Sequence, residues 1–261
     1  MKTALITGAS RGIGRAFATE LARRGYNLLL VARSADQLEQ AATELRQQAG
    51  VEVAVLAQDL AASNAAEQVA EWANSQTQEL AVLVNNAGYG LWGRFEELSL
   101  AEQQSMLQLN MHVPVALTHR LLPALRQQKK SFILNVSSTA AYQAVPTLTL
   151  YAASKAFLLS FSRGLRYELR GSGVSVTCLS PGATTTDFAD RAGMSAGLQE
   201  TANKVSMTPE QVAQAGIAAM LAGEAELIPG ALNKVSAHLT GLVPKALTEK
   251  IAAGIYEKHL K

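Results

Sequence analysis

The N-terminal stretch Lys2-Thr-Ala-Leu-Ile-Thr-Gly-Ala-Ser-Arg-Gly-Ile-Gly14 joins an apolar segment to three closely spaced glycines. Residues 2–7 predict a buried strand, and residues 15–24 carry the apolar pattern of a helix. A glycine turn between a strand and a helix lets the backbone approach a pyrophosphate, and the helix N-terminus offers free N–H groups. The stretch therefore predicts a dinucleotide site, although its Gly-x-x-x-Gly-x-Gly spacing differs from the common Gly-x-Gly-x-x-Gly fingerprint.

Apolar segments of strand length alternate with helical patterns along the chain. We expect strands at residues 27–31, 51–56, 80–84, 132–136 and 174–179. This alternation predicts an α/β protein with a Rossmann fold: one domain over residues 1–261, with a doubly wound, mostly parallel sheet of six to seven strands and helices on both faces. Ligands bind such sheets outside the carboxyl ends of the strands. The residues that follow strands and should meet there are Gly8, Arg33, Asp59, Asn85 and Ser138.

The end of the second strand bears on the choice of dinucleotide. A site for NAD(H) carries a carboxylate there to bind the ribose 2′-hydroxyl, whereas this chain has Arg33. Asp36 is expected within the next helix and pointing away. Because a guanidinium suits a phosphate, Arg33, assisted by Arg11 of the glycine turn, favours NADP(H). The alternative is that Arg33 is a solvated residue at the start of the next helix.

A second chemical pattern lies between residues 138 and 155. Ser138 follows a predicted strand, and Tyr151 and Lys155 stand four residues apart in a helical stretch, so they share one helix face. A nearby ammonium favours the phenolate and lowers the pKa of a phenol, and a hydroxyl opposite could hold a carbonyl oxygen. The joint spacing predicts a general acid for reducing a ketone or a general base for oxidising an alcohol, although each pair alone is commonplace.

Composition narrows the classes of protein. The net charge of +2 does not indicate a nucleic-acid partner. The single cysteine, Cys178, excludes an intrachain disulfide, fits a reducing, cytoplasmic location, and is expected to be a buried strand residue. The four histidines do not cluster at metal-ligand spacings, so we predict no metal site. We expect no signal peptide, and no apolar stretch reaches the ~20 residues of a membrane span.

Further segments are expected to shape the site. Residues 89–93 form a glycine-flexed apolar loop that should line a substrate pocket. Residues 100–128 predict one helical region, which Pro114 should kink. Residues 183–207 are rich in Ala, Thr, Gly and Met with little periodicity, so we expect a mobile substrate lid. Thr208-Pro-Glu-Gln211 predicts the start of a helix.

The motifs together resemble the short-chain dehydrogenase/reductase family in its compact subgroup. The matching pieces, which lie between Lys2 and Leu221, are Thr7-Gly-Ala-Ser-Arg-Gly-Ile-Gly14, Asp59-Leu60, Asn85-Asn-Ala-Gly88, Asn110, Asn135-Val-Ser-Ser138, Tyr151-Ala-Ala-Ser-Lys155, and Pro181-Gly182 with Thr186. They occur in the family's order and at its spacing, so the joint match is specific.

The resemblance implies a role for each matching residue. Tyr151 would be the general acid/base, Ser138 would hold the substrate oxygen, and Lys155 would bind the nicotinamide ribose and lower the pKa of Tyr151. Asn110 would kink its helix and hold a water in a proton relay to Lys155, and Asp59 would hydrogen-bond the adenine. The remaining cofactor contacts would come from Gly8, Ser10, Arg11, Gly12, Ile13, Gly14, Arg33, Leu60, Asn86, Ala87, Gly88, Pro181, Gly182 and Thr186, the last on the carboxamide.

The resemblance also implies a function. It is an NADP(H)-dependent oxidoreductase that transfers a hydride between nicotinamide and an apolar ketone or secondary alcohol, as carbonyl and ketoacyl reductases do. The implied assembly is a homodimer or homotetramer. Two alternatives stay open: a non-catalytic NADP-sensing or scaffold protein on the same fold, and an enzyme of transient oxidation such as an epimerase or dehydratase.

Residues 228–261 depart from the family pattern, in which many members end in a strand followed by paired glycines. We expect a short or altered seventh strand and then a helical C-terminal extension. An apolar stripe at helical spacing comprises Val235, Leu239, Leu242, Val243, Leu247, Ile251 and Ile255, with Lys234, Lys245, Lys250, Lys258 and Lys261 along it. Packing over the substrate mouth or against another subunit is favoured over docking on a membrane surface and over disorder.

Overall fold

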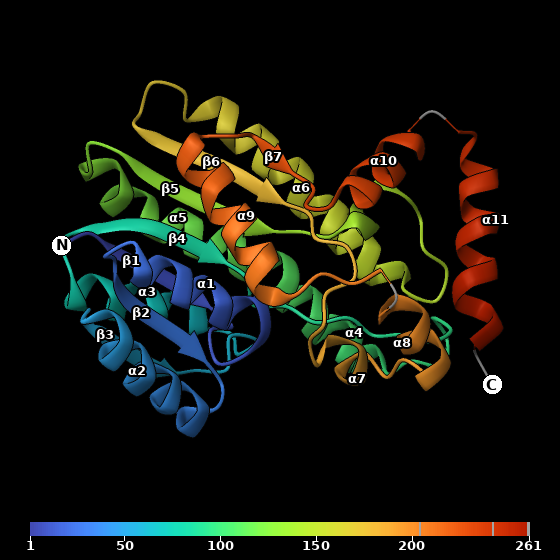
Figure 1. Cartoon of the computed structure of the whole chain (residues 1–261), viewed down its shortest axis with the longest axis horizontal. Helices are drawn as coiled ribbons and strands as arrows, with labels where there is room; N and C mark the ends of the chain where they lie inside the picture. The colour runs from blue at the N-terminus through green and yellow to red at the C-terminus, as the bar shows by residue number, and fades with distance from the viewer. Residues whose placement is uncertain (204, 242, 260–261) are drawn as a thin grey trace.

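A parallel sheet forms the centre of the computed structural model, which describes residues 1–203, 205–241 and 243–259 (Figure 1). Its strands are β1 (Thr3–Thr7), β2 (Asn27–Ala32), β3 (Val53–Ala57), β4 (Leu80–Asn85), β5 (Ser131–Val136), β6 (Val174–Leu179) and β7 (Glu226–Leu227). Their order is β3-β2-β1-β4-β5-β6-β7, and every neighbouring pair is parallel. The predicted doubly wound sheet is confirmed; the third strand begins at Val53 rather than at Val51.

Helices cover both faces of the sheet, as predicted. They are α1 (Gly12–Arg23), α2 (Ala35–Ala49), α3 (Ala65–Gln76), α4 (Leu100–Leu107), α5 (Val113–Gln127), α6 (Thr149–Glu168), α7 (Phe188–Arg191), α8 (Ala196–Asn203), α9 (Pro209–Ala222), α10 (Ala231–Leu239) and α11 (Lys245–Tyr256). One core cluster joins the sheet to α1, α2 and α9. A second cluster joins the opposite face to α3, α5 and the end of α6.

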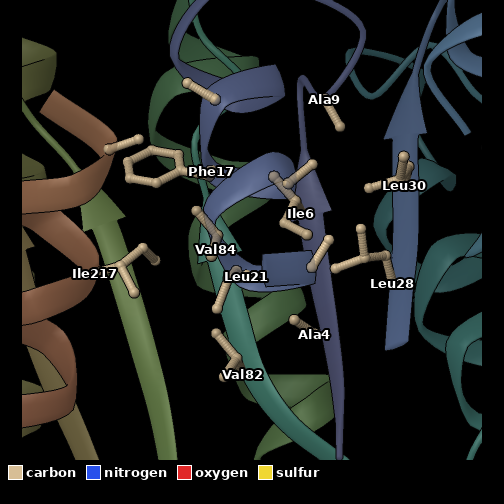
Figure 2. Packing of buried hydrophobic residues seen from close by; sticks show 14 of the residues in the cluster. Ala4, Ile6, Ala9, Phe17, Leu21, Leu28, Leu30, Val82, Val84 and Ile217 are labelled. Atoms are coloured by element: carbon tan, nitrogen blue, oxygen red, sulfur yellow. The ribbon is translucent and has the colours of Figure 1, made fainter. Parts of the chain in front are cut away.

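The alternation of side chains along β1 shows how the two cores are divided. Ile6 belongs to the cluster under α1, while its neighbour Leu5 belongs to the cluster on the other face. Figure 2 shows Phe17 of α1 lying between the sheet and Ile217 of α9. Strands with both faces buried have continuous apolar sequences, which is why the chain's strands could be recognised as unbroken hydrophobic runs. Cys178 is buried in β6, as expected.

The strand order reverses between β1 and β4, because the chain moves outward from β1 to β3 and then returns to the other side of β1. Crossover helices leave β1 and β4 in opposite directions at such a point, and a crevice opens beyond the carboxyl ends of the strands. The glycine turn follows β1 and the Asn85-to-Gly88 segment follows β4. The predicted dinucleotide motif therefore lies at the position where doubly wound sheets bind their ligands.

The expected helical region of residues 100–128 is divided in the structure. A π-helical turn, Gln108–His112, separates α4 from α5. Pro114 lies in the first turn of α5, where a missing N–H removes no helical hydrogen bond. The irregularity thus precedes the proline that was expected to cause it, and it contains Asn110.

The C-terminal region is helical after the two-residue strand β7, which confirms the expected short seventh strand. Several members of the apolar stripe face outward in the single chain: Val235, Leu239, Leu247 and Ile251 are between 50% and 57% exposed. The packing of the stripe over the substrate mouth or against another subunit stays a prediction. Leu242 and Lys261 lie outside the described residues. The buried positions of α11 are instead Thr248 and Ala252.

Residues 183–207, the predicted lid, contain α7 and α8, and Lys204 lies outside the described residues. Thr208 begins α9 with a reciprocal capping box, in which its side chain and that of Gln211 each accept a backbone hydrogen bond, so the predicted helix start is confirmed. None of the helices in the described ranges is both long and apolar enough to cross a bilayer.

Candidate active site

A cavity of about 1290 Å³ lies beyond the carboxyl ends of the strands and is called the crevice below. Two of the predicted residues, Asn110 and Asn85, do not line it; Asn85 is buried and donates hydrogen bonds to Thr118 and Asn135 instead. The predicted residues that do line it are Gly8, Ser10, Arg11, Gly12, Ile13, Gly14, Arg33, Asp59, Leu60, Asn86, Ala87, Gly88, Ser138, Tyr151, Lys155, Pro181, Gly182 and Thr186. The topology therefore brings the scattered motifs together in one place.

The glycine turn is built for close backbone packing. Gly8 and Gly12 adopt φ values of +67° and +56°, which side-chain-bearing residues rarely adopt. A Cβ atom on Gly14 would overlap the Gly8 carbonyl oxygen and would lie 2.5 Å from Nδ2 of Asn86. Asn86 holds the turn from the neighbouring strand end, since its Nδ2 donates hydrogen bonds to the carbonyls of Thr7 (2.9 Å) and Gly8 (3.3 Å).

The N-terminus of α1 opens into the crevice without a side-chain cap. Arg11 occupies the N-cap position, and its side chain accepts no hydrogen bond from the first turn of the helix. The turn therefore presents its N–H groups and the positive end of the helix dipole to whatever lies in the crevice. This is an arrangement that suits a phosphate or pyrophosphate.

Arg33 lies at the far end of the crevice, immediately after β2. Ser34, not Arg33, caps α2 by accepting a hydrogen bond from the Gln37 N–H, so Arg33 stands outside the helix and lines the crevice. Within residues 1–203, 205–241 and 243–259, no carboxylate lies within ion-pair distance of Arg33. Asp59 lines the same end, where its Oδ1 accepts a hydrogen bond from the Ala61 N–H at 3.0 Å.

Tyr151 and Lys155 lie one turn apart on α6, facing the end of β5. Both are buried, with 8% and 5% of their surfaces exposed. The Lys155 Nζ donates a hydrogen bond to the Val136 carbonyl at 3.0 Å and lies 5.7 Å from the centroid of the Tyr151 ring. The Ser138 hydroxyl lies near enough to the Tyr151 phenol to lower its pKa, and its Oγ accepts a hydrogen bond from the Ala140 N–H. The structure thus groups the three residues that the sequence predicted to act together.

Burial controls the protonation of this pair. It raises the pKa of Tyr151 to about 12, while the Ser138 hydrogen bond opposes the rise and the nearby phenol of Tyr256 adds to it. Burial also lowers the pKa of Lys155 to about 8. In the structure without its cofactor, burial thus dominates the pKa of Tyr151, and the lowering of that pKa by Lys155 stays a prediction. The loss of solvation disfavours both charged forms, and spacing along a helix carries no information about this loss.

Asn110 lies behind the crevice in the π-helical turn and is 1% exposed. Its Oδ1 accepts a hydrogen bond from the Tyr89 N–H (3.2 Å), and its Nδ2 donates to the Tyr89 carbonyl (3.0 Å) and to the Ser154 Oγ (3.1 Å). Asn110 thereby fixes the chain after Gly88 to the helix that carries Lys155. Its predicted part in a water relay stays a prediction.

Apolar and aromatic side chains line the other end of the crevice. They include Val145, Leu148, Phe188, Met194, Leu198, Ile255 and Tyr256. The Phe188 ring lies 5.3 Å from the ring of Tyr151. Of the predicted 89–93 loop only Tyr89 lines the crevice; Leu91 and Trp92 pack behind it against a small core cluster.

Sequence reasoning missed several of these lining residues. Asp187, Phe188 and Arg191 lie in a segment without periodicity, so no pattern distinguished them from their neighbours. Tyr256 lay just beside the apolar stripe of the tail, and the structure turns it, rather than most of the stripe, toward the protein. The one signal in the sequence was that Tyr256 is an aromatic residue lying off the apolar stripe of its helix.

A glycine turn at the topological switch point, with an uncapped helix N-terminus and a buried Ser-Tyr-Lys group beside it, defines a dinucleotide-dependent protein of Rossmann type. The family is more specific. Residues 2–196 match the family model described as short chain dehydrogenase. The chain belongs to the short-chain dehydrogenase/reductase family of oxidoreductases, as its motifs predicted.

Curated relatives include several reductases. The ketoacyl reductase HetN of Nostoc sp. is 32% identical over 244 residues, which cover 93% of this chain and 83% of that protein. The very-long-chain 3-oxoacyl-CoA reductase of Anas platyrhynchos is 38% identical over 184 residues, which cover 68% of this chain. The match spans only 58% of the length of that relative.

Solved structures share the fold over nearly the whole chain. A short-chain dehydrogenase from Sphingobium yanoikuyae in complex with NADPH gives a TM-score of 0.81 at 31% identity, covering 94% of this chain and 98% of that one. An alcohol dehydrogenase from the archaeon Thermococcus sibiricus, complexed with 5-hydroxy-NADP, gives a TM-score of 0.76 at 31% identity, covering 87% and 95%. Several structural neighbours are thus NADP(H) complexes. One from Burkholderia phymatum, in complex with NAD, is 24% identical and shows the fold alone.

Proposed function

We propose that this protein is an NADP(H)-dependent reductase of apolar ketones, which also oxidises the corresponding secondary alcohols. The observation that carries the proposal is the buried Tyr151 phenol, which lies near the Ser138 hydroxyl and beside Lys155 in a crevice that also contains the glycine turn. The reductase relatives and the NADPH-bound structural neighbours support the same reaction class.

The cofactor end of the crevice fits NADP(H). The glycine turn and the uncapped N-terminus of α1 would hold the pyrophosphate, and Asp59 would contact the adenine. Arg33, which has no carboxylate partner among the described residues, would hold the 2′-phosphate. When bound, the nicotinamide ring supplies or accepts the hydride.

Proton transfer is the task of the chain's own residues. Because the pKa of Tyr151 is raised to about 12, its phenol holds a proton throughout the neutral range. A ketone oxygen held by Ser138 and Tyr151 gains negative charge during reduction. The resulting alkoxide is a stronger base than the phenolate, so Tyr151 can give up its proton to that oxygen. Lys155, whose Nζ is anchored on the Val136 carbonyl, then lies close enough to stabilise the phenolate.

The apolar end of the crevice indicates the kind of substrate. Its walls come from Phe188, Met194 and Leu198 of the lid and from Val145 and Leu148 before α6. A chain or ring without charges would bury its surface against these side chains. We therefore propose an apolar ketone as substrate, a class that includes ketoacyl groups.

The test of the reaction is Tyr151→Phe. The variant should lose at least about a hundredfold in the rate of NADPH-dependent ketone reduction, because proton transfer by a positioned group contributes on that scale. NADPH binding, measured by fluorescence titration, should stay unchanged. Tyr26→Phe removes another partly buried phenol, outside the crevice, and is the matched control. Parental turnover by Tyr151→Phe would contradict the proton role.

The test of cofactor choice is Arg33→Ala. The dissociation constant for NADPH should rise by about tenfold or more, the scale of a charge-assisted hydrogen bond pair, and that for NADH should change little. Equal effects on both cofactors would contradict the 2′-phosphate role. NADPH binding without any oxidation across a panel of ketones would favour the alternative of a cofactor-sensing protein.

A further inference from the structure

Arg191 is the last residue of α7, in the predicted lid, and its side chain points into the crevice rather than into solvent. It is partly buried, and its guanidinium carbon lies 4.3 Å from the centroid of the Tyr89 ring. Tyr89 directly follows the Asn85-to-Gly88 segment, and its hydroxyl donates a hydrogen bond to the Glu102 carbonyl. Arg191 thus rests on a ring that is itself fixed to α4, on the cofactor side of the crevice.

Positive charge accumulates around this side chain. Burial lowers the pKa of Arg191, and the charges of Arg33 and then Arg11 lower it further, while Tyr89 and Asp59 act in the opposite direction. Arg11 is paired with Asp187 at 2.8 Å. Across the part of the chain that the structure describes, neither Arg33 nor Arg191 has a carboxylate within ion-pair distance.

The guanidinium groups of Arg11, Arg33 and Arg191 line one crevice and repel one another. Among the described residues only Arg11 of these three is paired with a carboxylate, that of Asp187. A dianionic phosphate bound among them would convert this repulsion into attraction, and guanidinium groups match phosphate oxygens in geometry. The pyrophosphate has its own place at the N-terminus of α1. Arg33 and Arg191 line the same crevice and neither has a carboxylate partner among the described residues, so the remaining phosphate of NADP(H), the 2′-phosphate, is the one that fits them.

The contacts of the neighbouring lid residues fix the position of Arg191. Asp187 contacts Arg11 of the glycine turn, and Phe188 contacts the Tyr151 ring. Within five residues the same segment touches the glycine turn, the proposed proton donor and, through Arg191, the ring of Tyr89. These contacts hold α7 across the crevice.

We propose that Arg191 is a third guanidinium of the 2′-phosphate site, supplied by the lid, so that the 2′-phosphate of NADP(H) helps to hold the lid over the crevice. The proposal rests on the proposed function, because it requires that the crevice binds NADP(H). Arg191 would then contribute to the phosphate site from the lid, in addition to Arg11 of the glycine turn and Arg33 after the second strand. The position of the lid would depend on whether the cofactor is bound.

Isothermal titration with 2′,5′-ADP and with 5′-AMP isolates the phosphate, because the two nucleotides differ only in the 2′-phosphate. Arg191→Ala should weaken the binding of 2′,5′-ADP about tenfold and leave that of 5′-AMP within about twofold. Arg191→Gln, which keeps a planar group over Tyr89 without the charge, should behave in the same way. Arg94→Ala removes an exposed cation whose nearest carboxylate lies 3.9 Å away, and it should change neither constant.

Equal weakening of both nucleotides by Arg191→Ala would overturn the proposal, and so would parental binding of 2′,5′-ADP by Arg191→Gln. If Arg33→Ala weakens 2′,5′-ADP while both Arg191 variants do not, the third guanidinium is excluded and the proposed function stands. If the unaltered protein binds neither 2′,5′-ADP nor NADPH, the proposed function itself fails.

Discussion

At the scale of single residues, the buried pair Tyr151 and Lys155 decides what chemistry the site can do. Burial shifts the pKa values of both side chains in the direction that disfavours charge. Because the Tyr151 phenol keeps its proton, it can donate a proton but cannot accept one in this protonated form. In the cofactor-free protein Tyr151 therefore holds the proton that the proposed reduction of a ketone requires.

The Lys155 ammonium should leave a signature in the pH dependence of stability. Its pKa falls from 10.5 in the unfolded chain to about 8 in the folded one. Between these pH values the unfolded chain binds more protons than the folded chain, so the free energy of unfolding rises with pH. Lys155→Met lacks this titrating group, so its stability does not gain from it as the pH rises. The difference in the free energy of unfolding, variant minus parent, should therefore fall by roughly 3 kcal/mol between pH 8 and pH 10.5.

Urea unfolding of the cofactor-free parent and of Lys155→Met across this pH range measures the effect, because other titrating groups are common to both proteins. A difference in stability that stays constant across this pH range would show that the pKa of Lys155 is not lowered in the folded chain.

At the scale of elements, the glycine turn shows that a sequence motif can be a packing requirement as well as a binding site. Gly14 lies inside α1, yet the space for its Cβ is taken by the Gly8 carbonyl and by Nδ2 of Asn86. The absence of a side chain at Gly14 therefore lets the loop after β1 and Asn86, after β4, pack closely against the start of α1. The shape of the proposed phosphate site depends on that packing.

Gly14→Ala should destabilise the protein by about 1–3 kcal/mol, as overpacking of a dense site does, and should weaken NADPH binding because the turn must move. Gly164→Ala is the matched control, since Gly164 is also helical, in α6, with open space around its Cβ. That variant should be more stable than the parent by about 0.5–1 kcal/mol. Urea unfolding and NADPH titration measure both effects, and equal stabilities of the two variants would contradict the packing role.

The packing of the elements also explains which features could be predicted from the sequence. The first six strands and the glycine turn were recognisable because burial on both faces demands apolar runs and because close backbone packing demands glycine. The two residues of β7, which are only partly buried, form no such run. The Ser138, Tyr151 and Lys155 group was found because its spacing matches a known family. The contacts of Asp187 and Arg191 were not predicted, because they depend on how a segment without periodicity folds over the crevice. The inward packing of Thr248 and Ala252 in the tail was not predicted, because the apolar stripe of larger side chains, several of them exposed in the single chain, was the more prominent pattern in the sequence.

At the scale of the whole molecule, the crevice has two ends built from different parts of the chain. The cofactor end comes mainly from β1, β2, β4 and the loops that follow them. The substrate end comes from the start of α6, the lid and α11, which lies at the edge of the molecule in Figure 1. The Tyr256 side chain of α11 reaches the phenol of Tyr151, whose pKa it raises. The C-terminal extension therefore contributes Ile255 and Tyr256 to the lining of the crevice.

This division predicts that the two ends can be altered separately. Tyr256→Ala removes a wall of the substrate end, so the KM for an apolar ketone should rise by roughly tenfold, because the substrate no longer buries apolar surface against that ring. The dissociation constant for NADPH should stay within about twofold of the parent's. Tyr167→Ala removes an exposed tyrosine of α6 and should change neither value. If Tyr256→Ala weakened NADPH and ketone binding alike, α11 would support the crevice as a whole. A selective rise in KM, steepest for the longest ketones, would show that the extension shapes only the substrate end.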